Sequence, residues 1–155
     1  MMKLLTENLV CLDVDASDKW EVIKFLCNKM RCENLVRDNF LDYVIEREKA
    51  APTGLPTEIG IAIPHTTGDH VIKSSIAMAQ LKKPVPFYSM EDPEKEISVE
   101  LVFLLAIANP SNQILLLRSL MEIFRSRENL FTMKNARSKK TIVALFDRVG
   151  KNIQK

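Results

Sequence analysis

The chain has 155 residues, of which 46% are apolar and 27% charged, and its formal net charge is +2. This length and composition are typical of one globular domain, residues 1–155, with a core of ordinary size. The small net charge argues against nucleic-acid binding, which usually depends on a concentrated basic face. Basic residues concentrate only at positions 137–155, where apolar residues alternate with them, so we interpret this stretch as the solvated face of an amphipathic helix.

Targeting and membrane segments are not predicted. Residues 1–5 run directly into polar residues, without the apolar segment of a signal peptide. The longest apolar run, residues 101–108, is far shorter than the roughly 18 residues of a membrane helix. The three cysteines have no metal-ligand spacing. We therefore expect a cytoplasmic protein with reduced thiols, no metal or cofactor, and no insertion into the membrane.

Two helices are predicted in the N-terminal third of the chain. Ser17 or Asp18 can cap the first, because Glu21 lies three residues beyond Asp18 as in a capping box. Its buried stripe is expected at Trp20, Ile23, Cys27 and Met30. The second helix is expected over about 36–49, with a solvated last turn made of the charged residues 46–49. Its inward side chains are expected to be Phe40, Tyr43 and Val44.

The middle of the chain predicts strands. Residues 59–63 form a short apolar run that Pro64 ends, and residues 74–81 alternate between two faces. Prolines confine residues 85–88 to an edge piece. Residues 99–108 are the most apolar segment, which suits a central strand covered on both faces.

A helix start follows the central strand, with Asn109 as N-cap and Pro110 at the first helical position. Its buried stripe is expected at Ile114, Leu117, Leu120 or Met121, and Phe124. Shorter helices are expected from about residue 128 and from Ser138. This order of elements predicts an α/β (α+β) fold, in which α-helices flank a mixed central β-sheet.

Glycine and proline concentrate around one histidine. Three of the four glycines and three of the seven prolines lie between positions 52 and 68. His65 follows Pro64 at a strand end and precedes a Thr-Thr-Gly turn, where a reactive side chain can be exposed on a rigid backbone. The alternative, which residue type alone favours, is a loop histidine without a function.

Most site chemistries lack their residues in this sequence. His65, Asp69 and His70 make a weak zinc site, and neither a nucleophile elbow nor a phosphate-binding glycine loop is present. What remains is a histidine that is itself the nucleophile, because neutral imidazole can attack a phosphoryl group without a separate base. The phosphoryl product needs hydrogen-bond donors, for which Arg47 and the helix start at residue 109 are candidates.

The same residues resemble a known family, the IIA proteins of the bacterial phosphoenolpyruvate-dependent sugar phosphotransferase system, of the fructose/mannitol type. The resemblance is carried by Arg47-Glu48, Pro52-Thr53-Gly54-Leu55-Pro56, Gly60-Ile61-Ala62-Ile63-Pro64-His65, Pro84-Val85-Pro86-Phe87, residues 101–108 and the helix after Asn109. It implies a phosphotransferase in which His65 accepts a phosphoryl group from the phosphohistidine of HPr. His65 would then pass the group to a cysteine of a IIB partner, which phosphorylates sugar entering through a IIC membrane component. Arg47 matches a phosphate-stabilising arginine of the family.

One departure from the mannitol type concerns a second active-site histidine, whose position Gln113 occupies here. A glutamine can donate a hydrogen bond to phosphate but cannot titrate. Galactitol-type proteins are more similar to this chain, in the Asn109-Pro110…Gln113…Leu116-Leu117-Arg118 segment and in a histidine five residues after the nucleophile, here His70. His70 could orient His65, bind phosphate, or be a surface histidine.

Two alternatives to a sugar-uptake carrier remain open at this point. One is a regulatory phosphoprotein similar to nitrogen-type IIA proteins, and the other is a non-catalytic interaction module of the same fold. The intact Pro64-His65 pair and Arg47 argue against the second alternative. A IIA domain fused to a transcription regulator is disfavoured, because the sequence shows no DNA-binding segment. The sugar and the oligomeric state do not follow from these residues.

Overall fold

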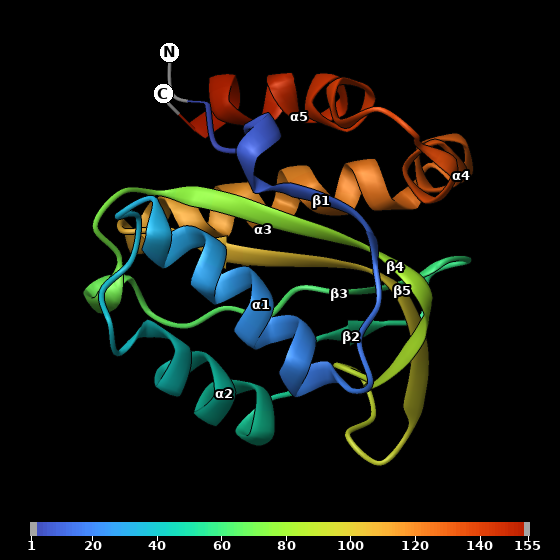
Figure 1. Ribbon diagram of the computed structural model, residues 1–155, viewed down its shortest axis with the longest axis horizontal. Helices are drawn as coiled ribbons and strands as arrows, with labels where there is room; N and C mark the ends of the chain where they lie inside the picture. Colours follow the sequence, from blue (N-terminus) through green and yellow to red (C-terminus); the bar gives the residue numbers. More distant parts are fainter. Residues whose placement is uncertain (1–2, 154–155) are drawn as a thin grey trace.

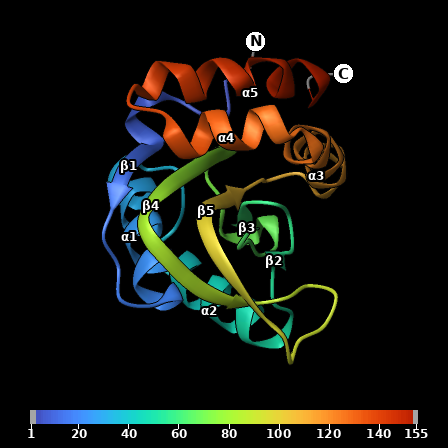
Figure 2. The ribbon, with the colours of Figure 1, turned by 90° about the vertical axis from the view of Figure 1, so that its right-hand side faces the viewer.

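A mixed five-stranded sheet carries the fold in the computed structural model, which describes residues 3–153 and their side chains as far as residue 147. The strand order is β1-β4-β5-β3-β2. The strands are β1 (Val10–Val14), β2 (Gly54–Leu55), β3 (Gly60–Ala62), β4 (Ser75–Tyr88) and β5 (Glu96–Ala106). The pairs β1–β4 and β3–β5 are parallel, whereas β4–β5 and β2–β3 are antiparallel. Figure 2 shows β4 and β5 as two long curved strands at the middle of the sheet.

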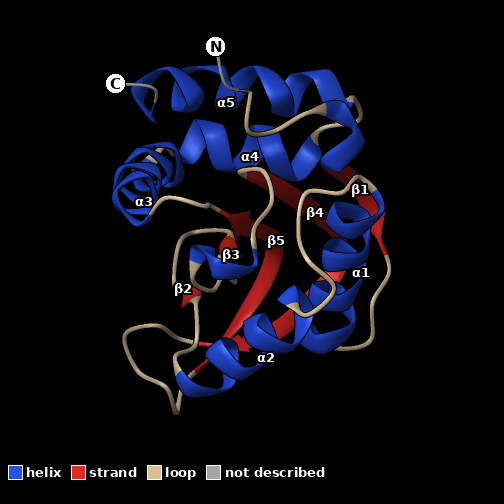
Figure 3. Cartoon of the chain, turned by 90° about the vertical axis from the view of Figure 1, so that its left-hand side faces the viewer, coloured by secondary structure: helices blue, strands red, loops and turns tan. Residues whose placement is uncertain are grey.

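Helices cover both faces of this sheet (Figures 1 and 3). Over the described residues they are α1 (Lys19–Cys32), α2 (Phe40–Ala50), α3 (Pro110–Arg125), α4 (Arg127–Asn135) and α5 (Lys139–Ile153), with short 3₁₀ turns η1 (Glu7–Leu9) and η2 (Gly68–His70). Helices α1 and α2 lie on one side, and α3, α4 and α5 on the other. The predicted α/β (α+β) fold with a flanked mixed sheet is confirmed.

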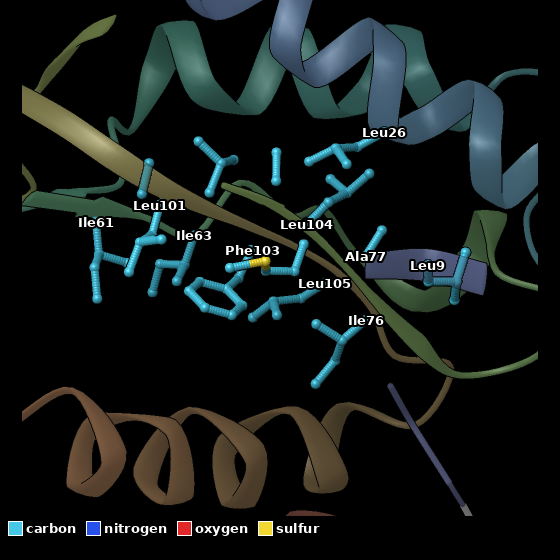
Figure 4. Close-up of a cluster of buried hydrophobic side chains, with 14 of the residues drawn as sticks. Leu9, Leu26, Ile61, Ile63, Ile76, Ala77, Leu101, Phe103, Leu104 and Leu105 are labelled. Atoms are coloured by element: carbon cyan, nitrogen blue, oxygen red, sulfur yellow. The ribbon is translucent and has the colours of Figure 1, made fainter. Parts of the chain in front are cut away.

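Strand β5 lies at the centre of the core. Its residues from Leu101 to Ala106 are all buried, and successive side chains point to opposite faces (Figure 4). Phe103 contacts Phe124 of α3 and Phe146 of α5 at ring-centroid distances of 5.1 and 5.4 Å. Leu104 points to the other face, toward α1. The predicted central strand, covered on both faces, is therefore present.

Local capping chemistry sets the helix starts. The side chain of Asp18 accepts a hydrogen bond from the Glu21 N–H at 2.9 Å, so Asp18 caps α1. Asn109 caps α3 in the same way, through the Ser111 N–H at 2.9 Å, and Pro110 occupies the first turn. Helix α4 begins one residue before the predicted position, because Ser126 caps it through the Asn129 N–H.

Strand β4 departs from the prediction of a separate edge piece at residues 85–88. It runs without interruption to Tyr88 and pairs with β5 along the whole stretch from Val85. Its pairing with β1 ends at Leu81, so β4 has a single neighbouring strand where the prolines lie. A proline lacks the N–H that a second neighbour would need, and this open side tolerates it. The short strands β1 and β2 were not predicted.

Several predicted inward positions are wrong by part of a helical turn. Helix α2 begins at Phe40 and not at about residue 36. Val36 instead forms an isolated β-bridge to Val71, and a turn at residues 38–39 precedes the helix. Tyr43 is exposed, and Trp20 is half-buried beneath the ammonium groups of Lys19 and Lys49. In α3 the expected Ile114 is 63% exposed, and the fully buried stripe is Leu116, Leu120 and Phe124.

A buried glutamine joins the sheet to the C-terminal helices. The side-chain amide of Gln80, on β4, donates to the carbonyls of Met133, Lys134 and Ala136 at 3.0, 3.1 and 2.9 Å. Its oxygen accepts the Asp13 N–H of β1 at 3.1 Å. One side chain thus satisfies the free carbonyls at the end of α4, which would otherwise be left without partners. Helix α5 then buries Ile142, Val143 and Phe146, as expected of an amphipathic helix, and residues 154–155 of the predicted basic stretch lie outside the described residues.

Candidate active site

His65 lies just beyond β3, at the end of the sheet where β5 leads into α3. Its backbone forms a parallel bridge to Leu105 of β5, and the Leu105 N–H donates to the carbonyl of Pro64 at 3.0 Å. The central strand therefore fixes the backbone on which the imidazole stands. The rigid backbone expected here is present, but the expected exposure is wrong, because the residue is only 6% exposed.

One nitrogen of the His65 imidazole is already engaged. Nδ1 lies 2.7 Å from the carbonyl oxygen of Ile63. A carbonyl can only accept, so Nδ1 carries the proton of this hydrogen bond and donates it. In the neutral ring the other nitrogen, Nε2, then has a free lone pair.

The surroundings of His65 favour this neutral form. Burial is the main cause that lowers the pKa of His65 below its ordinary value of 6.5. The hydrogen bond to Ile63 acts in the opposite direction, and the positive charge of Arg47 lowers the pKa further. At neutral pH the imidazole is therefore uncharged, with Nε2 available as a nucleophile.

Arg47 reaches this region from the last turn of α2. Its side chain is exposed, and its charge is near enough to act on the pKa of His65. The fold thus brings together two residues that lie 18 positions apart in the chain. Such an exposed guanidinium offers several N–H donors to an anion.

The start of α3 packs against the loop that follows His65. A Cβ atom added to Gly68 would lie 2.7 Å from the carbonyl carbon of Ala108 and 2.8 Å from the carbonyl oxygen of Ile107. Only glycine permits this close approach. The start of α3 therefore lies beside the same loop. Its first-turn N–H groups are engaged within the helix start, because that of Ser111 donates to the Asn109 side chain and those of Asn112 and Gln113 donate to the Asn109 carbonyl. Pro110 has no N–H.

Gln113 lies on the first turn of α3 and is half-buried. Its backbone N–H donates to the Asn109 carbonyl at 3.2 Å. No side-chain hydrogen bond of Gln113 is formed within the described part of the chain, so its amide is free to serve a ligand. The structure places the residue at the helix start that adjoins the His65 loop.

His70 packs against α2. Its ring stacks on Tyr43 with a centroid distance of 3.9 Å and an interplanar angle of 11°. Its carbonyl accepts the Arg37 N–H at 2.9 Å. Tyr43 lies one helical turn before Arg47, so the two share a face of α2. His70 makes no hydrogen bond to His65 among the described residues, and its stack on Tyr43 brings the loop into contact with α2.

Glu48 corrects the expectation of a solvated last turn in α2. The side chain is 3% exposed, and its two oxygens accept the N–H and the hydroxyl of Thr53 at 2.9 and 2.7 Å. Its neighbours Arg47 and Lys49 are exposed, as predicted. Sequence reasoning named Glu48 and Thr53 only as part of the family motif and missed the contact between them. The available signal was a threonine five residues after an acidic residue at a helix end, which is not specific.

Among the described residues, no group of three or more His, Cys, Asp or Glu side chains is arranged to hold a metal ion. Within the same residues, no helix is both long and apolar enough to cross a membrane.

Comparison with known proteins identifies the family. Residues 3–149 match the family model for the phosphoenolpyruvate-dependent sugar phosphotransferase system, EIIA 2. The galactitol-specific EIIA component of Escherichia coli K12 is 32% identical over 117 residues, which cover 75% of this chain and 77% of that protein. This similarity agrees with the predicted resemblance to the galactitol type.

Solved structures share the fold at lower identity. The complex of enzyme IIAMTL with phosphorylated enzyme IIBMTL from Escherichia coli matches with a TM-score of 0.72 and 23% identity, over 92% of this chain and 97% of that one. The nitrogen regulatory protein IIA-Ntr from Neisseria meningitidis matches with a TM-score of 0.74 and 21% identity, over 92% and 95%. The chain thus belongs to the EIIA 2 family of the phosphoenolpyruvate-dependent sugar phosphotransferase system.

Proposed function

We propose that this protein is a phosphoryl carrier in sugar uptake, in which His65 accepts a phosphoryl group from the phosphohistidine of HPr and passes it to a cysteine of a IIB protein. The observation that carries the proposal is the hydrogen bond from Nδ1 of His65 to the Ile63 carbonyl in a buried, uncharged imidazole. It leaves Nε2 as the reacting nitrogen. We place the carrier in the cytoplasm as one domain, residues 1–155.

The transfer needs no proton to leave His65. The Nε2 lone pair attacks the phosphorus of the donor, and the phosphorus–nitrogen bond of the donor imidazole breaks with its electron pair remaining on that imidazole. Nδ1 keeps its proton and its hydrogen bond to Ile63 throughout. In the second step a IIB thiolate attacks the phosphorus, and Nε2 of His65 leaves with its electron pair.

The phosphoryl oxygens need positive charge and N–H donors around them. Arg47 is the cation whose charge already acts on His65, and it would bind these oxygens. The positive end of the α3 dipole lies beside the His65 loop, and the side-chain amide of Gln113 can donate a hydrogen bond. His70 would act through position, since its stack on Tyr43 holds the loop to the face of α2 that bears Arg47.

Relatives support transport as the role of the carrier. The galactitol-specific EIIA component covers most of this chain at 32% identity, so we propose a galactitol-like sugar alcohol as the cargo of the system. The complex of IIAMTL with phosphorylated IIBMTL supports a IIB protein as the acceptor. The IIC component would take part only through IIB.

The experiment is phosphorylation in a reconstituted system. The protein is incubated with phosphoenolpyruvate, enzyme I and HPr, and the intact mass is measured. We expect an acid-labile, base-stable gain of one phosphoryl group that disappears in His65→Gln and persists in His70→Ala. No gain in the wild-type protein, or an unchanged gain in His65→Gln, would refute the proposal. A chase with IIB then tests whether the group moves on.

A further inference from the structure

A buried hydrogen-bond chain runs from the end of α2 to the imidazole of His65. Glu48 accepts two hydrogen bonds from Thr53, one from its N–H and one from its hydroxyl. The carbonyl of Thr53 accepts the Ile63 N–H at 3.4 Å. The carbonyl of Ile63 in turn accepts the Nδ1–H of His65 at 2.7 Å. The residue that precedes Glu48 is Arg47, so the two groups that the proposed function requires lie at the two ends of this chain.

The burial of Glu48 calls for a reason, because carboxylates are seldom buried without a charged partner. No ion pair to Glu48 is formed among the described residues, and both of its oxygens serve a single threonine. Burial raises the pKa of Glu48 above its ordinary value of 4.5, and the hydrogen bonds from Thr53 oppose that shift. Glu46, two residues earlier in the same helix, is exposed to solvent and avoids the cost of burial.

The position of Glu48 in α2 shows what the contact restrains. The helix ends at Ala50, and the Ala51 N–H closes its last turn on the carbonyl of Arg47 at 2.7 Å. Last turns fray readily because their carbonyls have no further helical partners. The two hydrogen bonds that Glu48 accepts from Thr53 tie the last turn of α2 to the segment that leads directly into β2 (Figure 1).

We propose that Glu48 is a positioning residue, which clamps Thr53 so that Arg47 on the last turn of α2 stays in fixed register with the imidazole of His65. This inference rests on the proposed function, since it assigns Glu48 a part in phosphoryl transfer. Glu48 itself touches no phosphoryl group. It acts through Thr53 and Ile63 on His65, and through the helix backbone on Arg47.

The test uses variants that break the clamp at either partner. Glu48→Met removes both acceptor oxygens and keeps a side chain of similar length, and Thr53→Val removes only the hydroxyl. Thr53→Ser keeps the hydroxyl and serves as the rescue variant. Glu46→Gln removes an exposed carboxylate from the same helix and is the matched control.

Two measurements are made on each folded variant. The first is the rate of phosphorylation by phospho-HPr at increasing donor concentration. We expect Glu48→Met and Thr53→Val to lower the maximal rate by roughly 10- to 100-fold, because misplacement by about 1 Å acts on the transfer step. The half-saturating concentration of donor should change little. Thr53→Ser recovers most of the rate, and Glu46→Gln equals the wild type.

The second measurement is the ¹⁵N spectrum of the His65 imidazole, which reads its tautomer without a phosphoryl donor. The clamp predicts a smaller Nδ1–H population in Glu48→Met and Thr53→Val than in the wild type. If the wild type is not phosphorylated, the proposed function fails while this spectrum still decides whether the clamp exists. Rates within twofold of wild type in both variants, or equal losses in Glu46→Gln, would overturn the inference. If Glu48→Met does not fold, the comparison of Thr53→Val with Thr53→Ser decides it.

Discussion

Replacing Gly68 by alanine should loosen the site by pushing the His65 loop off the start of α3. The added Cβ would meet the Ala108 carbonyl oxygen first, and it would lie 2.7 Å from the carbon of that carbonyl and 2.8 Å from the Ile107 oxygen. Ordinary contacts between carbon atoms are about 3.5–4.0 Å, so the loop or the strand end must move by on the order of 1 Å. Both neighbours are backbone atoms, which cannot swing aside as a flexible side chain would.

Two effects of Gly68→Ala oppose each other in the free energy of unfolding. Alanine has fewer conformations than glycine in the unfolded chain, which adds about 0.4–1 kcal/mol to the stability where the native backbone conformation suits alanine. Position 68 meets this condition, because no described glycine has a positive φ. Overpacking costs about 1–3 kcal/mol, and it outweighs the first effect. We expect a net loss of about 1–2 kcal/mol. The same displacement should slow phosphorylation of His65 by up to about 100-fold.

Urea unfolding gives the stability of Gly68→Ala, and the initial rate with phospho-HPr gives the transfer. Thr67→Ala is the control, because this neighbouring side chain is exposed and makes a single long contact, 3.4 Å, to Asp69. A Gly68→Ala protein as stable as the wild type, with an unchanged rate, would show that the close approach to α3 is not needed.

Three further predictions concern single side chains. Because the native pKa of His65 is lowered below 6.5, the unfolded chain takes up this proton first as the pH falls. The wild type should therefore lose stability relative to His65→Gln below about pH 6.5, by at most about 1.4 kcal/mol per pH unit. A difference in the free energy of unfolding, measured in urea, that stays constant with pH would contradict this. Gln80→Met leaves three carbonyls without a side-chain donor, so its free energy of unfolding should fall by at least about 2 kcal/mol. A loss below about 0.5 kcal/mol would be inconsistent with the hydrogen bonds to the end of α4. Arg47→Gln should lower the phosphorylation rate by about 10²–10³-fold with an unchanged thermal midpoint, because the side chain is exposed; a normal rate would remove Arg47 from the site.

Much of the fold was predictable because its signals are local. Asp18 and Asn109 cap their helices through residues two or three positions further on, and such caps can be found in sequence alone. The apolar run of β5 predicts burial on both faces for a similar reason. Strand β1 escaped prediction because it has only five residues and includes Asp13 at a φ of 53°, where the strand pattern is broken.

Other features depend on partners that are distant in the sequence or on the rotation of a helix. In α3 the predicted Leu120 and Phe124 are buried, but Leu116 continues their stripe toward the helix start instead of Ile114. The buried side chains follow a spacing of four residues, and Ile114 lies off that line. Glu48 lies within a charged run, so no pattern distinguishes it from its exposed neighbours; its burial depends on where Thr53 is placed by β2 and β3.

The site shows the same division. The backbone signals around His65 indicated a shaped turn, and the bridge to Leu105 gives that turn a physical basis. Arg47 was a candidate on its chemistry, and the family resemblance supported it. No local pattern shows that a helix end lies near a strand end 18 residues later, so its nearness to His65 could not be derived from the sequence. The stack of His70 on Tyr43 could be recognised only in the three-dimensional structure.

The most direct test of the proposed function locates the phosphoryl group on the ring. After phosphorylation by phospho-HPr, the imidazole ¹⁵N spectrum of the protein is compared with that of the unphosphorylated form. The hydrogen bond from Nδ1 to the Ile63 carbonyl predicts a phosphorus–nitrogen coupling at Nε2 of His65, with Nδ1 still protonated. Coupling at Nδ1, or phosphorylation on any other residue, would contradict the proposed mechanism.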